Sequence, residues 1–388
     1  MKLLKTKALK TLAIASFSAL AFAAGAQAQT QDPIKVGTIF PLSGGAGPQG
    51  QHVTQAIQAM AAIINESGGV LGRKIEVVSR DDESTPAVGV SRANDLISAG
   101  VSVIIEGWNS PVTLAMQPVI NRANILDITA ISKADPILSG EGNPYAIRLN
   151  SSNSQDGAVI AKYISETKAK RIAFMTENDA YGNGAQESIE AELKKLNYVY
   201  GKVAEEKFPF NQADFRVALT NVRAANPEVT IAINANEGLG MPALIRQAKQ
   251  SRLPGQLVTA VGTVAPSVIS VAGDAANGVI GADIYFPDVE PFASNEANKK
   301  FVAKTQEMFK YTPDKFMALG ATSLQVWAMA ANEVKSLDKE AIAKRIRGGS
   351  FKGTIFGDVT FAANGQLESN HKIFTIENQK IVVRPVSN

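Results

Sequence analysis

The sequence predicts an α/β fold in which parallel sheets form two lobes of similar plan. Short apolar runs alternate with amphipathic segments, which is typical of strands and helices that build parallel sheets covered on both faces. The alternation starts anew after Arg148. The chain has 388 residues, and the roughly 360 that follow its leader exceed what one hydrophobic core usually holds.

The first series of elements occupies the N-terminal third of the chain. The segment NESGGVLG (65–72) is rich in glycine and ends the first helix of this series. The expected strands are 34–40, 74–80, 101–107 and 125–129, and the expected helices are 51–64, 87–97 and 112–122.

The second series repeats this plan, and a helical tail follows it. The expected strands are 171–175, 198–203, 228–233 and 256–261, and the expected helices are 156–166, 184–196, 215–224 and 241–250. The tail contains helices at 295–310, 316–334 and 339–347, a β segment at 354–361, and the short β runs IFTI and KIVV. A tail that returns to earlier lobes predicts several crossing strands and therefore a hinge.

The N-terminus reads as a cleaved secretory signal peptide covering residues 1–28. Four lysines precede an apolar run at 12–24, and Ala26-Gln27-Ala28 has the small-x-small pattern of a cleavage site. A membrane anchor is the alternative, but the run is shorter than the ~20 residues of a spanning helix. No cysteine follows the site, so we do not expect a lipoprotein anchor.

The composition excludes several classes of protein. The chain has 39 basic and 36 acidic residues, and four of the basic residues lie in the leader. The remaining chain is therefore nearly neutral, and nothing in it indicates nucleic-acid binding. It has no cysteine, which excludes disulfides, thiol nucleophiles and cysteine metal sites, so stability has to come from core burial.

The segment PLSGGAGPQG (41–50) contains the spacing G-x-G-x-x-G after a strand, which can bind a dinucleotide pyrophosphate. That interpretation also needs an acidic residue about 20 positions further on, and the best candidate, Asp81, lies well beyond that distance. The two prolines in the loop lack the N–H groups that a phosphate needs. We therefore expect a flexible loop at the carboxyl edge of a sheet, where α/β proteins bind small ligands.

No catalytic or metal-binding pattern emerges from the sequence. The only histidines, His52 and His371, lie at opposite ends of the chain. The G-x-S-x-G, H-E-x-x-H and P-loop motifs are missing. The acidic run at 81–83 could indicate a metal site, but surface solvation or helix capping before Pro86 is the interpretation that we favour. We expect no enzyme activity, no cofactor and no metal.

The whole chain after the leader resembles the type I periplasmic binding proteins, specifically the leucine/isoleucine/valine-binding group that serves ABC importers. The resemblance rests on the order and spacing of several segments rather than on any one of them. They are IKVGTIFPLSGGAGPQGQ, VVSRDDESTPAVGVSRANDLI, IIEGWNSPVTLAMQPV, RLNSSNSQDGAVIAKYI, RIAFMTENDAYGNGAQES, NQADFRVALTNVRAANPE and VAGDAANGV.

The resemblance implies two Rossmann-like lobes joined by three crossovers, near residues 152, 286 and 370. The N-terminal lobe would contain 29–152 and 287–370, and the C-terminal lobe 153–286 and 371–388. The ligand would bind in the cleft between lobes that close by hinge rotation. The resemblance also implies a periplasmic location and an ABC permease in the inner membrane as partner. We expect the protein to be a monomer.

Three residues match cleft positions of the family. Ser110 matches the serine whose hydroxyl and N–H receive the ligand carboxylate, and it begins a helix, where N–H groups favour an anion. A plain N-cap is the other interpretation of Ser110. Tyr181 and Phe316 match cleft aromatics, although both could equally be core residues.

Other positions depart from the amino-acid-binding pattern. The second carboxylate-binding position falls at Lys133 and Ala134, where alanine has no hydroxyl and lysine could pair with an anionic ligand or be solvated. The usual acid for the ligand ammonium falls at Val261, which cannot balance a cation, so Glu237 is its candidate replacement. Gln49 stands where relatives often have an aromatic residue, which suggests a ligand with a polar distal end.

Trp108 and Asn109 are further candidates for the pocket wall, because the paired cysteines of some relatives are missing here. Trp108 could stack on a planar ligand or pack under its loop. Together these residues indicate a non-enzymatic receptor for a small carboxylate. The resemblance favours an amino acid; an aromatic acid without an amine is the alternative. A sensor ectodomain and an exported NAD-dependent enzyme are the minor hypotheses.

Overall fold

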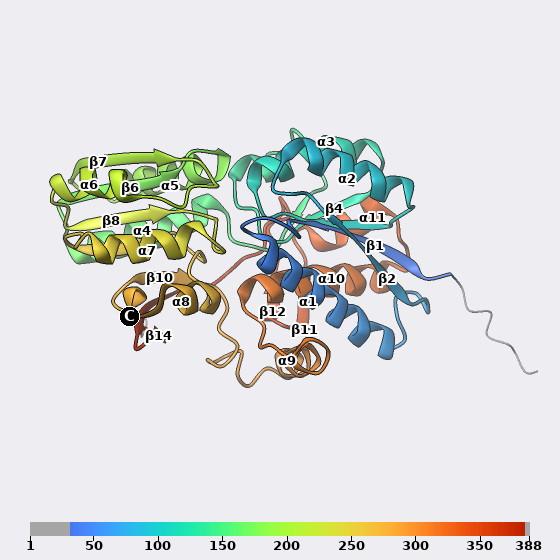
Figure 1. Cartoon of the computed structure of the whole chain (residues 1–388). Helices are drawn as coiled ribbons and strands as arrows, with labels where there is room; N and C mark the ends of the chain where they lie inside the picture. The colour runs from blue at the N-terminus through green and yellow to red at the C-terminus, as the bar shows by residue number, and fades with distance from the viewer. Residues whose placement is uncertain (1–31, 385–388) are drawn as a thin grey trace, which may run out of the picture. The chain divides into compact units, whose positions relative to one another are not determined.

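The computed structural model describes residues 32–384, and the predicted signal peptide lies outside them. These residues form a mixed α/β structure with two large sheets, each with its own helices (Figure 1). This confirms the predicted fold class. Within residues 32–384, no helix combines the length and the apolar character that a bilayer crossing requires.

The first sheet has five parallel strands in the order β2-β1-β3-β4-β5. Its inner strands are apolar because both faces are covered. Val36 and Phe40 of β1 pack into the cluster that includes α1 and α10, whereas Ile39 packs against α2 and α3 on the other face (Figure 1). The strands are β1 (Ile34–Phe40), β2 (Ile75–Asp81), β3 (Val103–Glu106), β4 (Leu126–Thr129) and β5 (Ile147–Arg148), and the helices are α1 (Gly47–Glu66), α2 (Pro86–Ser98) and α3 (Ser110–Arg122).

Three late helices and a hairpin return to the first sheet. Trp327 of α10 is fully buried in the core that also contains α1. A Cβ at Gly320 would lie 2.7 Å from Val53 Cγ1, so this glycine lets α10 and α1 approach closely. These elements are α9 (Glu296–Phe309), α10 (Lys315–Val334), α11 (Lys339–Ile346), β11 (Ser350–Thr354) and β12 (Gly357–Thr360). We call the first sheet with α1–α3 and α9–α11 the first lobe.

The second sheet has seven strands in the order β14-β13-β10-β9-β8-β6-β7. Helices α4 and α5 pack on one face, and α6 and α7 on the other. The strands are β6 (Arg171–Glu177), β7 (Gly201–Phe208), β8 (Val229–Ile233), β9 (Gln256–Thr259), β10 (Ile280–Asp283), β13 (Lys372–Glu377) and β14 (Lys380–Val383), and the helices are α4 (Asn153–Thr167), α5 (Ala180–Lys195), α6 (Arg216–Ala224), α7 (Gly240–Gln250) and α8 (Pro266–Ala272). We call the second sheet with α4–α8 the second lobe.

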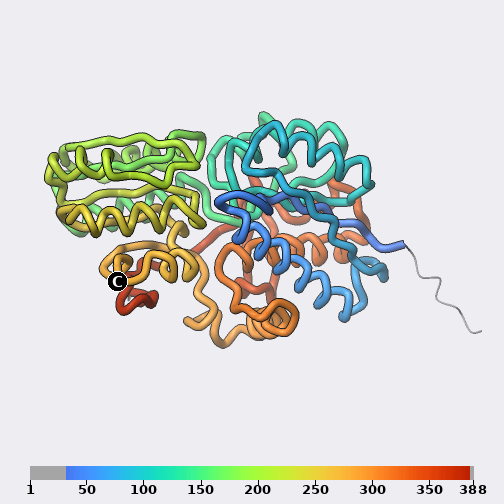
Figure 2. Tube along the Cα trace, in the orientation of Figure 1, coloured from blue at the N-terminus to red at the C-terminus, as the bar shows by residue number. Residues whose placement is uncertain are grey.

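The last two strands of the second sheet are antiparallel, whereas the sequence predicts parallel sheets. β13 pairs antiparallel with β10 and then turns into β14. Figure 2 follows this red C-terminal segment to its place beside the strand formed by residues 280–283. A tight turn at Asn378 and Gln379, both at positive φ, makes this pairing possible, because only antiparallel strands can be joined by so short a turn.

Several elements differ from the sequence-based expectation. The sequence analysis did not predict β5, α8 or β10. β5 has only two residues, and α8 and β10 are short and bounded by turns. β7 begins at Gly201 rather than at Tyr198, since this half-exposed edge strand carries four charged residues instead of an apolar run. α1 begins at Gly47, so Gln49 lies in a helix and not in the predicted loop.

The chain passes between the two sheets three times: from β5 to α4, from β10 to α9, and from the segment after β12 to β13. The carboxyl ends of β3, β4, β6, β8 and β9 therefore supply loops from both lobes. The exact lobe limits, 29–152 with 287–370 and 153–286 with 371–388, remain predictions.

Candidate functional site

A pocket lies at the carboxyl ends of strands from both sheets. This is the edge at which open α/β sheets bind ligands. The loops after β3 and β4, the first turns of α5 and α10, and the loops after β8 and β9 form its wall. Its lining residues are Trp108, Ile131, Lys133, Tyr181, Ala235, Glu237, Val261, Gly262, Thr263, Lys315 and Phe316.

Five of the nine residues predicted for the site line this pocket: Trp108, Lys133, Tyr181, Glu237 and Phe316. They come from five separate segments of the chain, and the fold brings them together. Gln49, Asn109, Ser110 and Ala134 do not line it, although all four are buried. The lining residues that were not predicted for the site are Ile131, Ala235, Val261, Gly262, Thr263 and Lys315.

Three aromatic side chains form the apolar part of the wall. The rings of Trp108 and Phe316 are tilted by 40° with centroids 4.9 Å apart. Trp108 Nε1 lies 3.4 Å from the Ala235 carbonyl, which can accept its hydrogen. Trp108, Phe316 and Tyr181 also belong to the hydrophobic cores of their lobes. The ligand-contact and core interpretations of these residues are therefore compatible, and the core holds the rings rigid.

Lys133 is neither solvated nor free, which corrects one of the two sequence-based interpretations of this residue. Only 5% of it is exposed. Its Nζ donates to Asp156 Oδ2 at 2.5 Å and to the Val261 carbonyl at 2.8 Å. Lys133 follows β4 in the first lobe, whereas both acceptors belong to the second lobe. Its ammonium is thus held between the lobes by a carboxylate and a carbonyl.

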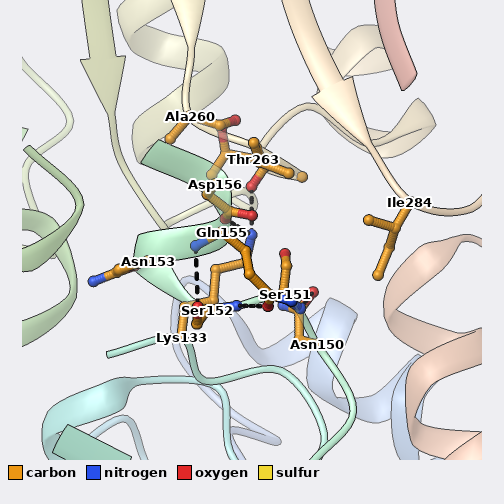
Figure 3. Close-up of polar contacts among 12 residues, drawn as sticks. Lys133, Asn150, Ser151, Ser152, Asn153, Gln155, Asp156, Ala260, Thr263 and Ile284 are labelled. Atoms are coloured by element: carbon orange, nitrogen blue, oxygen red, sulfur yellow. Dashed lines mark hydrogen bonds and ion pairs between the residues drawn. The ribbon is translucent and has the colours of Figure 1, made fainter. Parts of the chain in front are cut away.

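Asp156 is held in place by the start of α4. Ser152 and Gln155 form a reciprocal capping box, in which Ser152 Oγ accepts from Gln155 N–H at 3.1 Å and Gln155 Oε1 accepts from Ser152 N–H at 2.8 Å. Figure 3 shows this first turn with Asp156, Lys133 and Thr263 around it. The second Asp156 oxygen lies 3.0 Å from His371 Nε2.

The charge environment keeps Asp156 ionised. Burial raises the pKa of Asp156, but the positive charge of Lys133 and the hydrogen bond from His371 outweigh it and lower the pKa to about 2. The sequence indicated only that His371 is remote from the other histidine. Its pairing with Asp156 depends on the passage from the first lobe into β13, which the sequence pattern does not reveal.

Lys315 is the most informative lining residue that the sequence analysis missed. Its Nζ donates to the Gly262 carbonyl at 3.0 Å and lies 3.8 Å from Asp283 Oδ1 and 4.1 Å from the Phe316 ring centroid. Burial lowers its pKa. Gly262 has a φ of +74°, and a Cβ there would collide with Lys315 Nζ. A lone lysine opening an otherwise apolar helix is the signal that could have identified it.

Glu237 is the acidic residue of the pocket wall, and it has no strong partner. It is 4% exposed, and its Oε2 has no hydrogen-bond partner among residues 32–384. Burial raises the pKa of Glu237 to about 8, even though the charges of Lys315 and Lys133 lower it. Burial therefore disfavours the charged form of this carboxyl.

Ser110 does not line the pocket, but its side chain holds the loop that carries Lys133. Asn109, not Ser110, is the N-cap residue of α3, which corrects the capping interpretation. Ser110 Oγ accepts from the N–H groups of Lys133 at 3.2 Å and Ala134 at 3.1 Å. The Ala134 carbonyl in turn accepts from Arg148 Nη1 at 2.7 Å. The hydroxyl thus fixes the loop that carries Lys133 and keeps its own hydrogen to donate.

The other two predicted residues flank the site. Gln49 lies in the first turn of α1, next to Gly238: a Cβ on Gly238 would lie 3.0 Å from Gln49 Oε1. Neither Gln49 Oε1 nor Asn109 Oδ1 has a hydrogen-bond partner among the described residues. Both side chains therefore remain candidates for polar contacts.

Replacing Ser110 with alanine is expected to lower the free energy of unfolding by about 1–2 kcal/mol, because two buried N–H groups lose their acceptor. Urea unfolding followed by circular dichroism measures this change. The exposed serine Ser139, whose Oγ donates only to the Pro136 carbonyl, is the matched control, and Ser139→Ala should change stability by less than half as much. Equal stability of Ser110→Ala and the natural chain would contradict the assigned role.

The chain is similar to known proteins over most of its length. A family model described as "Periplasmic binding protein" matches residues 33–380. A Leu/Ile/Val-binding protein of Citrobacter freundii is 30% identical over 372 residues, which is 94% of each chain. Leu/Ile/Val-binding protein homolog 1 of Brucella abortus (strain 2308) is 27% identical over 335 residues, 86% of this chain and 87% of that protein.

Two solved structures illustrate the similarity of fold. A leucine binding protein from Thermotoga maritima MSB8 has a TM-score of 0.79 and 25% identity, covering 91% of this chain and 98% of that one. A solute binding protein of an ABC transporter from R. palustris, in complex with benzoate, has a TM-score of 0.82 and 22% identity, covering 91% and 95%. The latter likeness concerns the fold alone.

Proposed function

Because the chain belongs to the periplasmic binding protein family, we propose that it binds a small carboxylate as the solute receptor of an ABC importer and delivers it to a permease. The family implies a periplasmic location and makes the chain a binding protein rather than an enzyme. The delivery step, the permease in the inner membrane and the monomeric state are parts of the proposal.

One observation carries the carboxylate proposal: two buried lysines and three aromatic rings line a single pocket built from both lobes. Lysine ammonium groups favour an anion, and burial strengthens that attraction. The aromatic rings offer an apolar surface for the rest of the ligand. Ser110 Oγ accepts from the N–H of the lining residue Lys133 and has a hydroxyl hydrogen to donate.

Two ligand classes fit this role. An amino acid is supported by the names of the relatives, which are Leu/Ile/Val-binding proteins, and by Glu237 as an acceptor for the ammonium. A carboxylate without an amine is supported by the two lysines and by Val261 at the position where the family usually has an acid. The charges of the pocket favour the second class.

A thermal-shift panel tests the proposal. The natural chain is mixed with leucine, phenylalanine, benzoate and 3-phenylpropionate, and with ribose as the uncharged control. A ligand at 100 times its dissociation constant should add about 2.7 kcal/mol to the free energy of unfolding. Stabilisation by at least one carboxylate and not by ribose is expected. Stabilisation by ribose alone, or by none of these carboxylates, would overturn the carboxylate proposal.

A further inference from the structure

We infer that Lys133 occupies the ammonium site of this pocket from within the protein and thereby selects against ligands that carry an α-amine. The inference rests on the proposed function, because it concerns which carboxylates the receptor accepts. It assigns to Lys133 a role in specificity that goes beyond pairing with an anionic ligand. Four features of the pocket support it.

The first feature is the geometry of the acceptors. Lys133 Nζ lies 2.5 Å from Asp156 Oδ2 and 2.8 Å from the Val261 carbonyl oxygen. A carboxylate and a carbonyl arranged around one point are the partners that an ammonium group with three N–H donors requires. Val261 and Lys133 both line the pocket, so this point lies at the pocket wall, where a ligand amine would otherwise reach it.

The second feature is that the charge of Asp156 is already balanced. Lys133 and His371 each contact one of its oxygens, and Arg148 and Lys315 lie close enough for their charges to interact with it. A ligand amine brought to this site would add a further cation beside Lys133. Like charges at such separations in a buried site repel strongly.

The third feature is the state of the other acids around the pocket. Asp283 accepts from the Ile284 N–H at 2.7 Å and has Lys315 Nζ 3.8 Å away. Glu237 is the remaining acidic group of the wall, and Lys315 and Lys133 already interact with its charge. Asp314 is committed to capping α10, with its Oδ1 accepting from the Met317 N–H. Among the described residues that line the pocket, Glu237 is therefore the one acidic group, and an incoming amine would meet a carboxyl whose charged form burial disfavours.

The fourth feature is that Lys133 is held in place independently of any ligand. Its backbone N–H donates to Ser110 Oγ, and its carbonyl accepts from the Asn153 N–H at 2.9 Å. The first contact ties the Lys133 backbone to α3 of the first lobe, and the second ties it to α4 of the second lobe. A positioned internal ammonium of this kind costs little ordering entropy when a ligand binds.

The test uses ligand pairs that differ only in the α-amine: 3-phenylpropionate with phenylalanine, and 4-methylpentanoate with leucine. Isothermal titration calorimetry at pH 7 gives the ratio of dissociation constants within each pair. One of the two pairs will bind more tightly to the natural chain. Within that pair, the dissociation constant of the amine-free acid should be at least tenfold lower than that of the amino acid.

Two variants separate the role of Lys133 from general damage. Lys133→Met keeps the length and the apolar stem but frees Asp156, so the ratio should move at least tenfold toward the amino acid. The double variant Lys133→Met/Asp156→Asn also removes the carboxylate, so the ratio should stay near that of the natural chain. Lys339→Met is the matched control, because this buried lysine donates to Asn121 Oδ1 and neither residue lines the pocket.

The outcomes are distinguishable. Tighter binding of the amino acid by the natural chain, or an unchanged ratio in Lys133→Met, would overturn the inference even if that variant binds weakly. Binding of neither member of either pair by the natural chain would instead count against the carboxylate receptor itself, and the inference would fall with it. The measurement on the natural chain decides the matter even if a variant does not fold.

Discussion

Replacing Asp156 with alanine is expected to lower the free energy of unfolding by about 3–5 kcal/mol at pH 7, because it leaves the ammonium of Lys133 buried without a carboxylate. Lys133 is 5% and Asp156 7% exposed, so water cannot take over the missing interaction. His371 loses its partner in the same change. Urea-induced unfolding, analysed by linear extrapolation, measures the loss.

A control and a rescue make this expectation specific. Glu192 pairs with Lys195, whose side chain is 71% exposed, and Glu192→Ala should change stability by less than about 1 kcal/mol. Adding Lys133→Met to Asp156→Ala removes the unpaired charge and should recover most of the loss. A loss below about 1 kcal/mol, or no recovery in the double variant, would show that the pair has no such role.

The pH range of this contribution follows from the low pKa of Asp156. Its pKa is about 2 in the folded chain, below the usual 3.8. The stability that it contributes is therefore fully present above about pH 4 and is lost as the pH falls toward 2. The destabilising effect of Asp156→Ala should shrink over that interval.

Between pH 5 and pH 8 the free energy of unfolding is expected to fall as the pH rises, by up to about 1.4 kcal/mol per pH unit for each buried carboxyl whose pKa is raised. Asp127 of β4 and Glu106 of β3 lie on adjacent strands and have no exposed surface. Burial raises the pKa of Asp127 to about 7. Burial, followed by the charge of Asp127, raises the pKa of Glu106 well above its usual range.

The sign follows from the raised pKa. Between its usual 3.8 and about 7, Asp127 binds more protons in the folded chain than in the unfolded chain, so raising the pH favours unfolding. Asp82 and Glu237, with pKa values raised by burial to about 7 and about 8, act in the same direction. His52, whose pKa is lowered by burial, acts in the opposite direction.

Asp127→Asn isolates the contribution of one carboxyl. The free energy of unfolding of the natural chain and of this variant is measured at pH 5, 6, 7 and 8. Plotted against pH, it should decline less steeply for the variant than for the natural chain. Asp288→Asn, at an exposed position, is the control and should leave the slope unchanged. Parallel curves for Asp127→Asn and the natural chain would refute the assignment.

The fold could be predicted largely from the sequence because its sheets are buried on both faces. The run IKVGTIF predicts β1, whose bounds agree with the structure, since every face of that strand needs apolar residues. β7 was misplaced because its exposed edge does not select an apolar pattern. β10 was missed because Gly281 lies against Phe374 and has no side chain to reveal a strand.

Several residues of the site could be predicted from the sequence, but the ion pairs and hydrogen bonds between them could not. Tyr181 and Phe316 were selected because they match cleft aromatics of the family, and Trp108 because the paired cysteines of some relatives are missing beside it. The partner of Lys133 could not be read from the chain, because Asp156 lies 23 positions away and His371 another 215 positions beyond Asp156. Electrostatic pairing depends on which loops share one edge of the sheets, and only the three-dimensional structure shows this.

The placement of β13 and β14 has a consequence for how the chain is made. Because β13 pairs with β10, the second hydrophobic core is incomplete until residues 372–383 have been synthesised, although its other strands end at Asp283. Until then the nascent chain exposes an unpaired strand edge at residues 280–283, which can pair with other chains. A product that stops short of the last strands would keep that edge open, so the finished sheet requires residues 372–383.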